Sequence, residues 1–288
     1  MARTRPGKNE GILAGGQEDA VELMESRVHG APSASEPDPD YIERNRAAWD
    51  SWAPGYLASG RKAWQEVDLH WGIWGVPETE LQLLAGIESG HDVVELGAGT
   101  AEVSAWLARR GARPVAVDLS ARQIRNAEVL QSEFQLSFPL VCSNAEAVHY
   151  EDASFHVAIS DYGASLWCDP QRWLPEAHRL LRPGGVLIFI TNSDLLMVCT
   201  PEGGGQAGDR LLRDFFAHSR MEFEEGGAVE FHSTHGNWIR LLRSSGFVVE
   251  NLMQVRPAAD ASPRYDFVTL DWARHWPSEE IWIARKPS

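Results

Sequence analysis

Apolar runs and amphipathic segments alternate through most of the chain from Pro77 onward. Short apolar runs are typical of strands in buried sheets, whereas apolar residues spaced three and four apart are typical of helices. The pattern predicts strands at 92–97, 114–120, 139–145, 155–164, 186–193, 247–255 and 279–287. It predicts helices at 77–90, 101–111, 121–134, 173–185 and 237–246. Strands separated by helices in this way indicate parallel crossovers and a doubly wound α/β sheet.

Two segments with a different texture precede this core. Residues 1–39 are rich in Gly, Pro, Ser, Ala and charge, so they cannot bury enough apolar surface to offset their ordering entropy, and we expect a mostly disordered tail. Residues 40–76 are rich in aromatic side chains, and Trp49, Trp52 and Tyr56 share one helical face that Pro54 kinks or ends. We therefore expect an aromatic-rich helical lid segment there. The core would span 77–288, with insertions at 193–233 and 256–278.

Composition and charge narrow the classes of partner. The 288 residues are 43% hydrophobic and carry a formal charge of −15, which favours one main globular domain and repels a phosphate backbone or an anionic membrane. The longest apolar run, Val186–Ile190, is far too short to span a bilayer. The three cysteines are scattered and lack the CxxC spacing of zinc or redox sites. We expect a reduced, cytoplasmic protein without a bound metal, a nucleic-acid partner or a membrane.

A glycine-containing turn follows the first predicted strand of the core. The residues from Glu95 to Ala101 read ELGAGTA and lie between a strand and a helix, where open α/β sheets bind ligands. Asp118 ends the second strand, at the spacing where a carboxylate accepts both hydroxyls of a ribose. Together the turn and the acid favour an adenosine-type ligand.

The acidic residues around this turn narrow the choice of ligand class. A dinucleotide fingerprint would have its third glycine at 102, but the chain has Glu102, and Glu95 adds a second carboxylate before the turn. A pyrophosphate would meet two like charges there. S-adenosylmethionine carries a cationic amino group and a sulfonium instead, so acids at this place suit it. The alternative is a loop that merely connects a strand to a helix.

The stretch VVELGAGTAEVSAWLARRGARPVAVDLS resembles the first two motifs of class I S-adenosylmethionine-dependent methyltransferases. The stretches SNAEAVHYEDASFHVAIS, HRLLRPGGVLIFI and GFVVENL agree with later parts of that family in order and spacing, so the similarity runs from about Glu78 to Pro287. The resemblance is to the small-molecule type with a methyltransferase type 11-like domain. It implies a Rossmann-like sheet of seven strands in the order 3-2-1-4-5-7-6, with the last strand antiparallel.

The resemblance also implies which residues contact the cofactor. The part around methionine would be lined by Glu95, Gly97, Ala98 and Gly99, with Ser160 approaching it from the fourth strand. The adenosine part would be held by Asp118 at the ribose and by Leu119, Asn144, Ala145 and Glu146 around the adenine. The chain departs from the family at Ala101, which replaces a frequent glycine, and at His156, which replaces a frequent aspartate.

The sequence carries fewer signals for the site that binds the methyl acceptor. Methyl transfer mainly needs alignment of the acceptor and exclusion of water, and a base is optional. The substrate-pocket candidates are Tyr56, Trp64, His70, Trp71 and Asp161. The alternative for the aromatic rings is burial against the sheet. The Gly-rich stretch PEGGGQAGD predicts either a mobile loop at the ligand-binding edge of the sheet or a flexible surface loop. The spacing of Trp272 and Trp276 predicts a helix packed on the core.

Three side chains are candidate bases: His232, His235 and Tyr162. Thr234 is a predicted N-cap, which places His235 in the first turn of a helix. The helix dipole there disfavours the imidazolium, so we expect a neutral imidazole. The alternative is that His235 is an exposed surface residue.

The sequence thus predicts S-adenosylmethionine-dependent methyl transfer to an O, N, S or C atom of a small organic molecule. A nicotinamide-dependent oxidoreductase and a non-catalytic cofactor-binding module remain as alternatives. A nucleic-acid or protein methyltransferase would need a basic or extended groove that the acidic composition does not indicate. The oligomeric state does not follow from the sequence.

Overall fold

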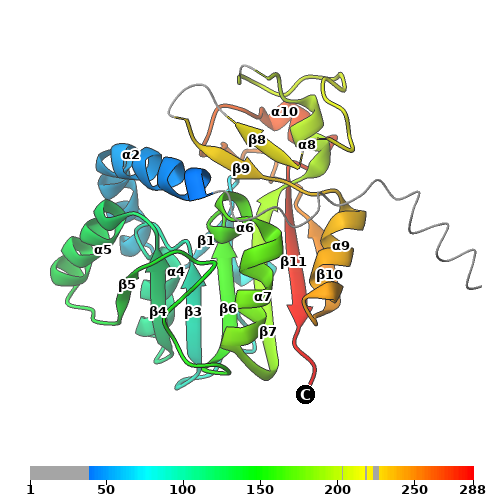
Figure 1. The fold of residues 1–288 in the computed structure, drawn as a ribbon. Coiled ribbons are helices and arrows are strands. Elements are labelled where there is room, and N and C mark those ends of the chain that lie inside the picture. Colours follow the sequence, from blue (N-terminus) through cyan, green and yellow to red (C-terminus); the bar gives the residue numbers. More distant parts are fainter. Residues whose placement is uncertain (1–38, 203, 218, 223–226) are drawn as a thin grey trace, which may run out of the picture. The chain divides into compact units, whose positions relative to one another are not determined.

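The central sheet has seven strands in the order β10-β11-β7-β6-β3-β4-β5 (Figure 1). The computed structural model describes residues 39–202, 204–217, 219–222 and 227–288, so the predicted tail lies outside the described residues except for its last position. Strands β5, β4, β3, β6 and β7 are parallel, and β11 is antiparallel to both β7 and β10. The order and direction predicted from the family resemblance are therefore confirmed.

The sheet strands lie close to their predicted positions. They are β3 (Asp92–Leu96), β4 (Arg113–Asp118), β5 (Leu140–Cys142), β6 (Phe155–Asp161), β7 (Leu181–Asn192), β10 (Val248–Gln254) and β11 (Glu279–Arg285). The helices that follow them are α4 (Glu102–Arg109), α5 (Ala121–Phe134), α6 (Ala164–Trp167), α7 (Pro170–Leu180) and α9 (His235–Ser244). Side chains of successive strand residues point to opposite faces, so each strand supplies two cores.

The two faces of the sheet are covered by different elements. On one face, Trp238 of α9 and Trp173 of α7 are fully buried with Trp282 of β11 and Phe189 of β7. On the other face, Ile281 of β11 belongs to a cluster formed with α4, with strands β1 (His70–Trp71) and β2 (Val76–Pro77), and with the segment that follows β10. At the end of each strand, successive side chains therefore enter the two different cores on opposite faces of the sheet.

The predicted helix at 77–90 is much shorter in the structure. The helix α3 covers only Glu78–Leu81, and Gln82 adopts a left-handed conformation at φ 53°. The carboxylate of Glu78 accepts hydrogen bonds from the backbone amides of Leu83 and Leu84 and from the indole N–H of Trp71. These amides would otherwise continue the helix, so the buried carboxylate ends it.

The aromatic-rich segment forms one continuous helix, α2 (Pro39–Gln65). Pro54 lies inside it and cannot donate to the carbonyl of Asp50, and that carbonyl accepts a hydrogen bond from Arg122 Nη1 at 3.3 Å instead. The shared helical face is confirmed, because the Trp49 ring lies 5.3 Å from the Trp52 ring and 5.4 Å from the Tyr56 ring.

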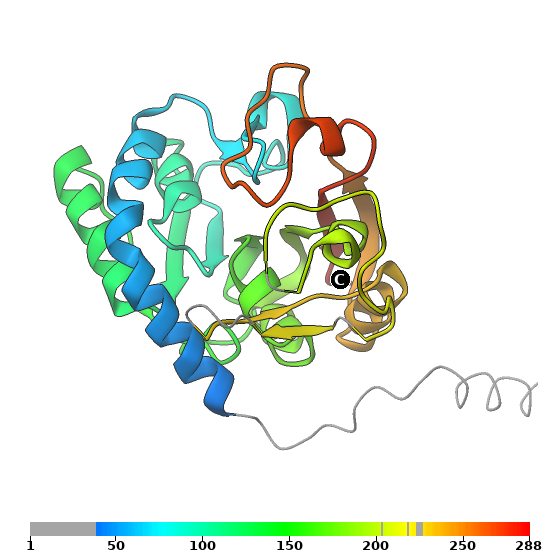
Figure 2. The ribbon, with the colours of Figure 1, turned by 90° about the horizontal axis from the view of Figure 1, so that it is seen from above.

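Both insertions contain short elements, and of these the sequence had indicated only the helix at Trp272. The first holds α8 (Asp194–Cys199) and the hairpin of β8 (Arg220–Glu222) with β9 (Val229–Phe231), and the second holds α10 (Leu270–Ala273). Trp272 is 5% exposed and packs on the core as expected, whereas Trp276 is 40% exposed. Seen from above, α2 and the two insertions surround the carboxyl ends of the strands (Figure 2). No helix in the described ranges is long and apolar enough to cross a bilayer.

Candidate cofactor and acceptor site

The glycine turn joins β3 to α4 at the carboxyl edge of the sheet, and its two glycines serve different purposes. Gly97 has φ 78°, and a Cβ atom there would lie 2.5 Å from the Cα of Gly163 in the next crossover. Gly99 has φ 54°, and a Cβ atom there would meet nothing within 4 Å. Gly97 therefore allows two backbone segments to touch, while Gly99 leaves open space beside the turn.

Asp118 is fixed against this turn from the end of β4. Its Oδ2 accepts a hydrogen bond from the amide of Gly99 at 2.7 Å, and its Oδ1 accepts one from the amide of Ser120 at 2.8 Å. Burial raises the pKa of Asp118 to about 6, although both amides favour the carboxylate. Each carboxylate oxygen keeps a free lone pair, so the group retains capacity to accept ribose hydroxyls.

Four carboxyl groups gather near the open turn, and we call them the acidic cluster: Glu95, Glu102, Asp161 and Glu279. Burial raises the pKa of Glu95 to about 8 and that of Glu102 to about 7, with a further contribution to both from the charge of Asp161. Burial likewise raises the pKa of Asp161, and it raises that of Glu279 to about 8. Burial thus disfavours the ionised form of these four carboxyl groups. A bound cation would stabilise that ionised form.

The hydrogen bonds of the cluster come from several elements. Glu95 accepts from the amide and the hydroxyl of Ser104 in α4. Asp161 Oδ2 accepts from the amide of Gly72 at 3.2 Å, and Glu279 Oε2 accepts from the amide of Ile73 at 2.8 Å. The turn between β1 and β2 therefore caps the cluster with backbone donors.

Two buried acceptors near the cluster have no partner in the described part of the chain. They are Oδ1 of Asp161, at the end of β6, and Oδ1 of Asn192, at the end of β7. Asn192 pairs in register with Glu279, so its side chain stands beside the cluster on the same sheet face. Buried polar atoms are usually satisfied, and unpaired ones at a strand edge are the atoms that a ligand would satisfy.

Of the residues predicted around the adenine, Leu119 follows β4, whereas Asn144, Ala145 and Glu146 follow β5. Asn144 Oδ1 accepts from the amide of Glu146 at 3.0 Å, which forms a tight turn. The carboxylate of Glu146 is occupied within the fold, because it accepts from the hydroxyl of Tyr41 at 2.5 Å and from Arg172 Nε at 2.6 Å. Ala145 is buried and Leu119 is half-buried. The turn is placed at the expected edge, and Glu146 ties it to α2 and α7.

Ser160 and Tyr162 flank Asp161 but are used internally. The hydroxyl of Ser160 donates to the carbonyl of Leu96 at 3.0 Å and is fully buried. The hydroxyl of Tyr162 donates to Glu279 Oε2 at 3.1 Å, and burial raises its pKa well above the ordinary value. A phenol with a raised pKa is a poor general base. Asp161, between them, is itself a member of the acidic cluster.

The aromatic candidates for the acceptor pocket separate into two groups. Trp64 is 2% exposed and donates to the carbonyl of Thr100, and Trp71 is 1% exposed and donates to Glu78, so both rings pack in the core. Tyr56 is half-buried on α2 and hydrogen-bonds to Tyr265 of the second insertion. His70 is half-buried, and its carbonyl accepts from Arg264 Nη2 at 3.1 Å.

The surroundings of His235 shift its pKa in the direction opposite to the one expected from the helix dipole. Thr234 caps α9 as expected, accepting from the amide of Asn237, and His235 lies in the first turn. Burial lowers its pKa, but the hydrogen bond from Nε2 to Glu280 at 2.5 Å and the charge of Asp194 outweigh it, so the net pKa is raised. His232 is 3% exposed, and its Nε2 lies 3.0 Å from Glu230 while its Nδ1 has no partner in the described chain.

Sequence reasoning missed Glu279, Asn192 and Arg264 as parts of this site. Arg264 is the cation whose charge acts on Glu102, Asp161 and Glu279. It comes from the second insertion, which has no regular pattern. A weak signal existed for Glu279, because an acid that opens an apolar strand is unusual.

The comparisons with known proteins agree with this geometry. The methyltransferase domain family matches residues 94–189, which cover the turn, Asp118 and the strand of Asp161. A ubiquinone biosynthesis O-methyltransferase of Parvibaculum lavamentivorans is 31% identical over 98 residues, which are 34% of this chain and 39% of that protein. The chain likewise matches only 39% of the length of the first curated relatives.

Solved structures share the fold over a longer range. A structure described as a putative S-adenosylmethionine-dependent methyltransferase from Listeria monocytogenes has a TM-score of 0.58 at 18% identity, covering 73% of this chain and 98% of that one. The Burkholderia thailandensis 1,6-didemethyltoxoflavin N1-methyltransferase, with its substrate and S-adenosylhomocysteine bound, has a TM-score of 0.56 at 16% identity, covering 90% and 94%. Residues 94–189 thus match a methyltransferase domain, and the chain shares its fold with solved S-adenosylmethionine-dependent methyltransferases.

Proposed function

We propose that this protein transfers the methyl group of S-adenosylmethionine to an O, N, S or C atom of a small organic molecule. The observation that carries the proposal is the acidic cluster beside the open turn at Gly99. Where these carboxyls ionise they would repel a pyrophosphate, whereas an amino group and a sulfonium would stabilise their ionised form. Two of the proteins named above are described as an O-methyltransferase of ubiquinone biosynthesis and an N1-methyltransferase of 1,6-didemethyltoxoflavin.

The residues present fit this cofactor. Asp118 would hold the ribose hydroxyls, and Leu119, Asn144 and Ala145 would flank the adenine. Glu95 and the turn from Gly97 to Gly99 would face the methionine part. The unpaired Oδ1 of Asp161 is an orphaned acceptor at the place where a cationic or N–H-bearing group would arrive. Glu146 and Ser160 support these residues, because their polar atoms are already engaged within the fold.

The chemistry makes modest demands on the protein. When bound, S-adenosylmethionine supplies an electrophilic methyl group. The protein has to orient an acceptor, exclude water and hold charge, and α2 with the two insertions encloses the strand ends in a way that serves this (Figure 2). Tyr56 and Tyr265 join α2 to the second insertion and are the pocket residues we propose, with His70 and Asp161. We leave Trp64 and Trp71 out because they pack in the core.

The proposed acceptor is neutral or cationic rather than anionic. A carboxylate or phosphate on the acceptor would face the carboxyl groups of Glu279 and Asp161 and the unpaired Oδ1 of Asn192. An amine, phenol or alcohol would donate to them. A cytoplasmic location and the lack of nucleic-acid and membrane partners stay predictions from composition.

Calorimetric titration with S-adenosylmethionine, S-adenosylhomocysteine and NADH tests the cofactor, and release of S-adenosylhomocysteine from a panel of phenols, amines and thiols tests the activity. Saturable binding of both sulfur ligands without NADH binding, followed by turnover of a donor-bearing acceptor, is the expected result. Selective NADH binding would overturn the proposal in favour of an oxidoreductase. Binding without turnover on the whole panel would favour a cofactor-binding module.

A further inference from the structure

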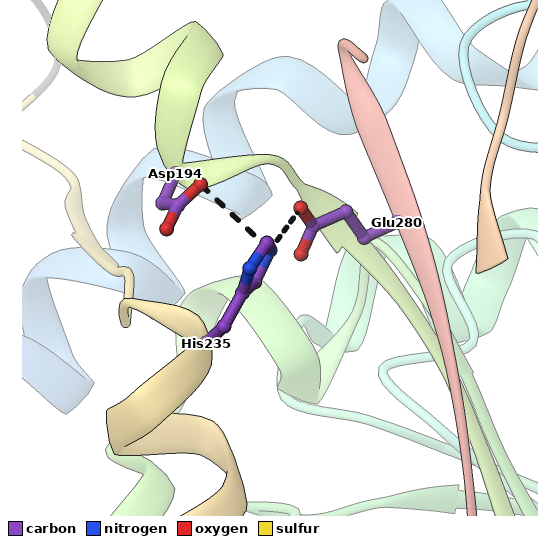
Figure 3. Close-up of side chains that lie close together, drawn as sticks. All are labelled: Asp194, His235 and Glu280. Carbon is purple, nitrogen blue, oxygen red and sulfur yellow. Dashed lines mark hydrogen bonds and ion pairs between the residues drawn. The ribbon is translucent and has the colours of Figure 1, made fainter. Parts of the chain in front are cut away.

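Three side chains converge on the other face of the sheet, away from the acidic cluster. His235 opens α9, Asp194 opens α8, and Glu280 belongs to β11 (Figure 3). In the part of the chain that the structure describes, they are the one group of three His, Cys, Asp or Glu residues whose donor atoms lie close enough to share a metal ion. All three donor atoms lie within 4.8 Å of one another.

The imidazole stands between the two carboxylates. His235 Nε2 lies 2.5 Å from Glu280 Oε1 and 3.8 Å from Asp194 Oδ1 (Figure 3). An ion with ligand distances of about 2.1 Å in tetrahedral geometry needs donors roughly 3.4 Å apart. A small rotation of Glu280 away from His235 and of Asp194 toward it would reach that spacing. The three atoms therefore already outline one face of a coordination shell.

The charge of this group is not balanced by the protein. The side chain of Glu280 is 1% exposed and that of Asp194 is 10% exposed. Neither forms an ion pair with a lysine or arginine among the described residues, and His235 is the one basic partner of both. When both carboxyls are ionised, a single imidazolium leaves one negative charge uncompensated. A divalent cation would neutralise it.

The surroundings resemble those of a metal site in two further respects. Gln254 Nε2 donates to Glu280 Oε1 at 3.4 Å, which orients the carboxylate from outside the group. The side chain of His235 is 37% exposed, so solvent can reach the group and complete a coordination shell. The mixed nitrogen and oxygen donors fit zinc, manganese or iron better than magnesium or calcium, which prefer oxygen alone.

We propose that Asp194, His235 and Glu280 bind one divalent transition-metal ion, with Zn²⁺ as the best-fitting member of that class. The ion would tie the first turns of α8 and α9 to β11. Because α8 begins the first insertion, metal binding would fix the base of that insertion to the sheet. The proposal does not depend on the methyl-transfer proposal, since its readout is metal binding itself.

The test uses full-length protein without an affinity tag, freed of metal by a chelator and titrated with Zn²⁺, Mn²⁺ and Mg²⁺ by calorimetry. We expect one Zn²⁺ per chain, weaker Mn²⁺ binding, no Mg²⁺ binding at comparable concentration, and a higher Tm with Zn²⁺. His235→Ala and Glu280→Gln should each weaken Zn²⁺ binding at least tenfold. His149→Ala, which changes an exposed histidine elsewhere, and Cys142→Ser, which removes an exposed thiol, should bind as wild type.

Circular dichroism and S-adenosylhomocysteine binding would identify a variant that fails to fold. Asp194→Asn, which keeps the shape of its side chain, and His235→Asn, which keeps a polar side chain but lacks the Nε2 atom, give milder second variants. Absence of saturable Zn²⁺ and Mn²⁺ binding by the wild type would overturn the proposal. So would undiminished binding by folded His235→Asn and Asp194→Asn, which would place the ion elsewhere.

Discussion

Asp118 and Gly99 are joined by a 2.7 Å hydrogen bond from the turn amide to the carboxylate, which holds the second strand against the glycine turn. Asp118→Asn keeps the shape of the side chain but removes its charge and one acceptor. A hydrogen bond to a charged group contributes about 1.5 to 3 kcal/mol, so affinity for S-adenosylhomocysteine should fall roughly ten- to a hundredfold. Calorimetric titration measures this change.

The matched control is Asp152→Asn, which changes a carboxylate whose side chain is 78% exposed and pairs with Arg179. It should bind the ligand as wild type. A Asp118→Asn variant that is folded and binds within twofold of wild type would remove Asp118 from the proposed site.

Gly97 and Gly99 provide a second comparison, because alanine should harm them in different ways. In Gly97→Ala the new Cβ would lie 2.5 Å from the Cα of Gly163, which is backbone and cannot rotate away. We expect a loss of about 3 kcal/mol or more in the free energy of unfolding. In Gly99→Ala the methyl enters open space, so the left-handed backbone alone costs about 1 to 2 kcal/mol.

Urea unfolding with ligand titration would separate these two roles. Gly99→Ala should fold and bind S-adenosylhomocysteine weakly, because the methyl occupies space that the ligand needs. If both variants lost the same stability, or if Gly99→Ala bound normally, the division of labour between the two glycines would be wrong.

The stability of the ligand-free protein should fall as pH rises through the neutral range. Burial raises the pKa of Glu95 to about 8, and glutamate in an unfolded chain titrates near about 4.3. The folded state therefore keeps a proton that the unfolded state releases at intermediate pH. The stabilisation is complete below about pH 4.3 and is lost by about pH 8. Tm measured from pH 5 to 8.5 should decline.

Glu95→Gln keeps the acceptor for Ser104 and removes the titration, so its Tm should depend less on pH than that of the wild type. Glu128→Gln, at an exposed position of α5, should retain the wild-type slope. Parallel slopes for wild type and Glu95→Gln would show that Glu95 keeps an ordinary pKa.

Asn45 should be more important for the enclosure of the site than its distance from the glycine turn suggests. It is 1% exposed, donates to the carbonyls of Trp167 and Val229, and accepts from the amide of Val229 at 2.7 Å. Asn45→Ala would leave these groups unpaired, at a cost of about 1 to 3 kcal/mol for each that stays buried. Limited proteolysis should then cut the region around β9 faster.

Arg46→Ala is the control, because Arg46 pairs only with Glu43 on the outside of the same helix in the described structure. It should be cut at the wild-type rate. Equal protection of β9 in both variants would mean that Asn45 does not hold the first insertion against α2.

The central sheet could be read from the chain because its strands and helices repeat strong local patterns. The helix at 121–134 was predicted with its observed bounds, since Ser120 caps it and its apolar residues keep a regular spacing. The helix at 77–90 failed because Glu78 turns inward and takes the amides, which local periodicity cannot reveal. Three-residue strands such as β8 and β9 are too short to carry any pattern.

The candidate site was predictable where one loop forms it and unpredictable where distant segments meet. Asp118 and the glycine turn lie in a single crossover, so their spacing indicated a shared ligand. Glu279 and Arg264 reach the same place only because β11 inserts between β7 and β10. The group of Asp194, His235 and Glu280 has the same origin, which explains why no ligand spacing appeared in the sequence.

The side chains of the two adjacent glutamates at the start of β11 lie on opposite faces of the sheet. Glu279 meets the backbone of Ile73 on one face, and Glu280 meets His235 on the other. Because both residues are glutamates, the role of each depends on strand register and not on side-chain chemistry. Deleting one residue just before Glu279 would shift Glu280 into the position of Glu279. Ile281 would then take the position of Glu280 on the opposite face. Length changes in that loop should thus be tolerated far less than substitutions.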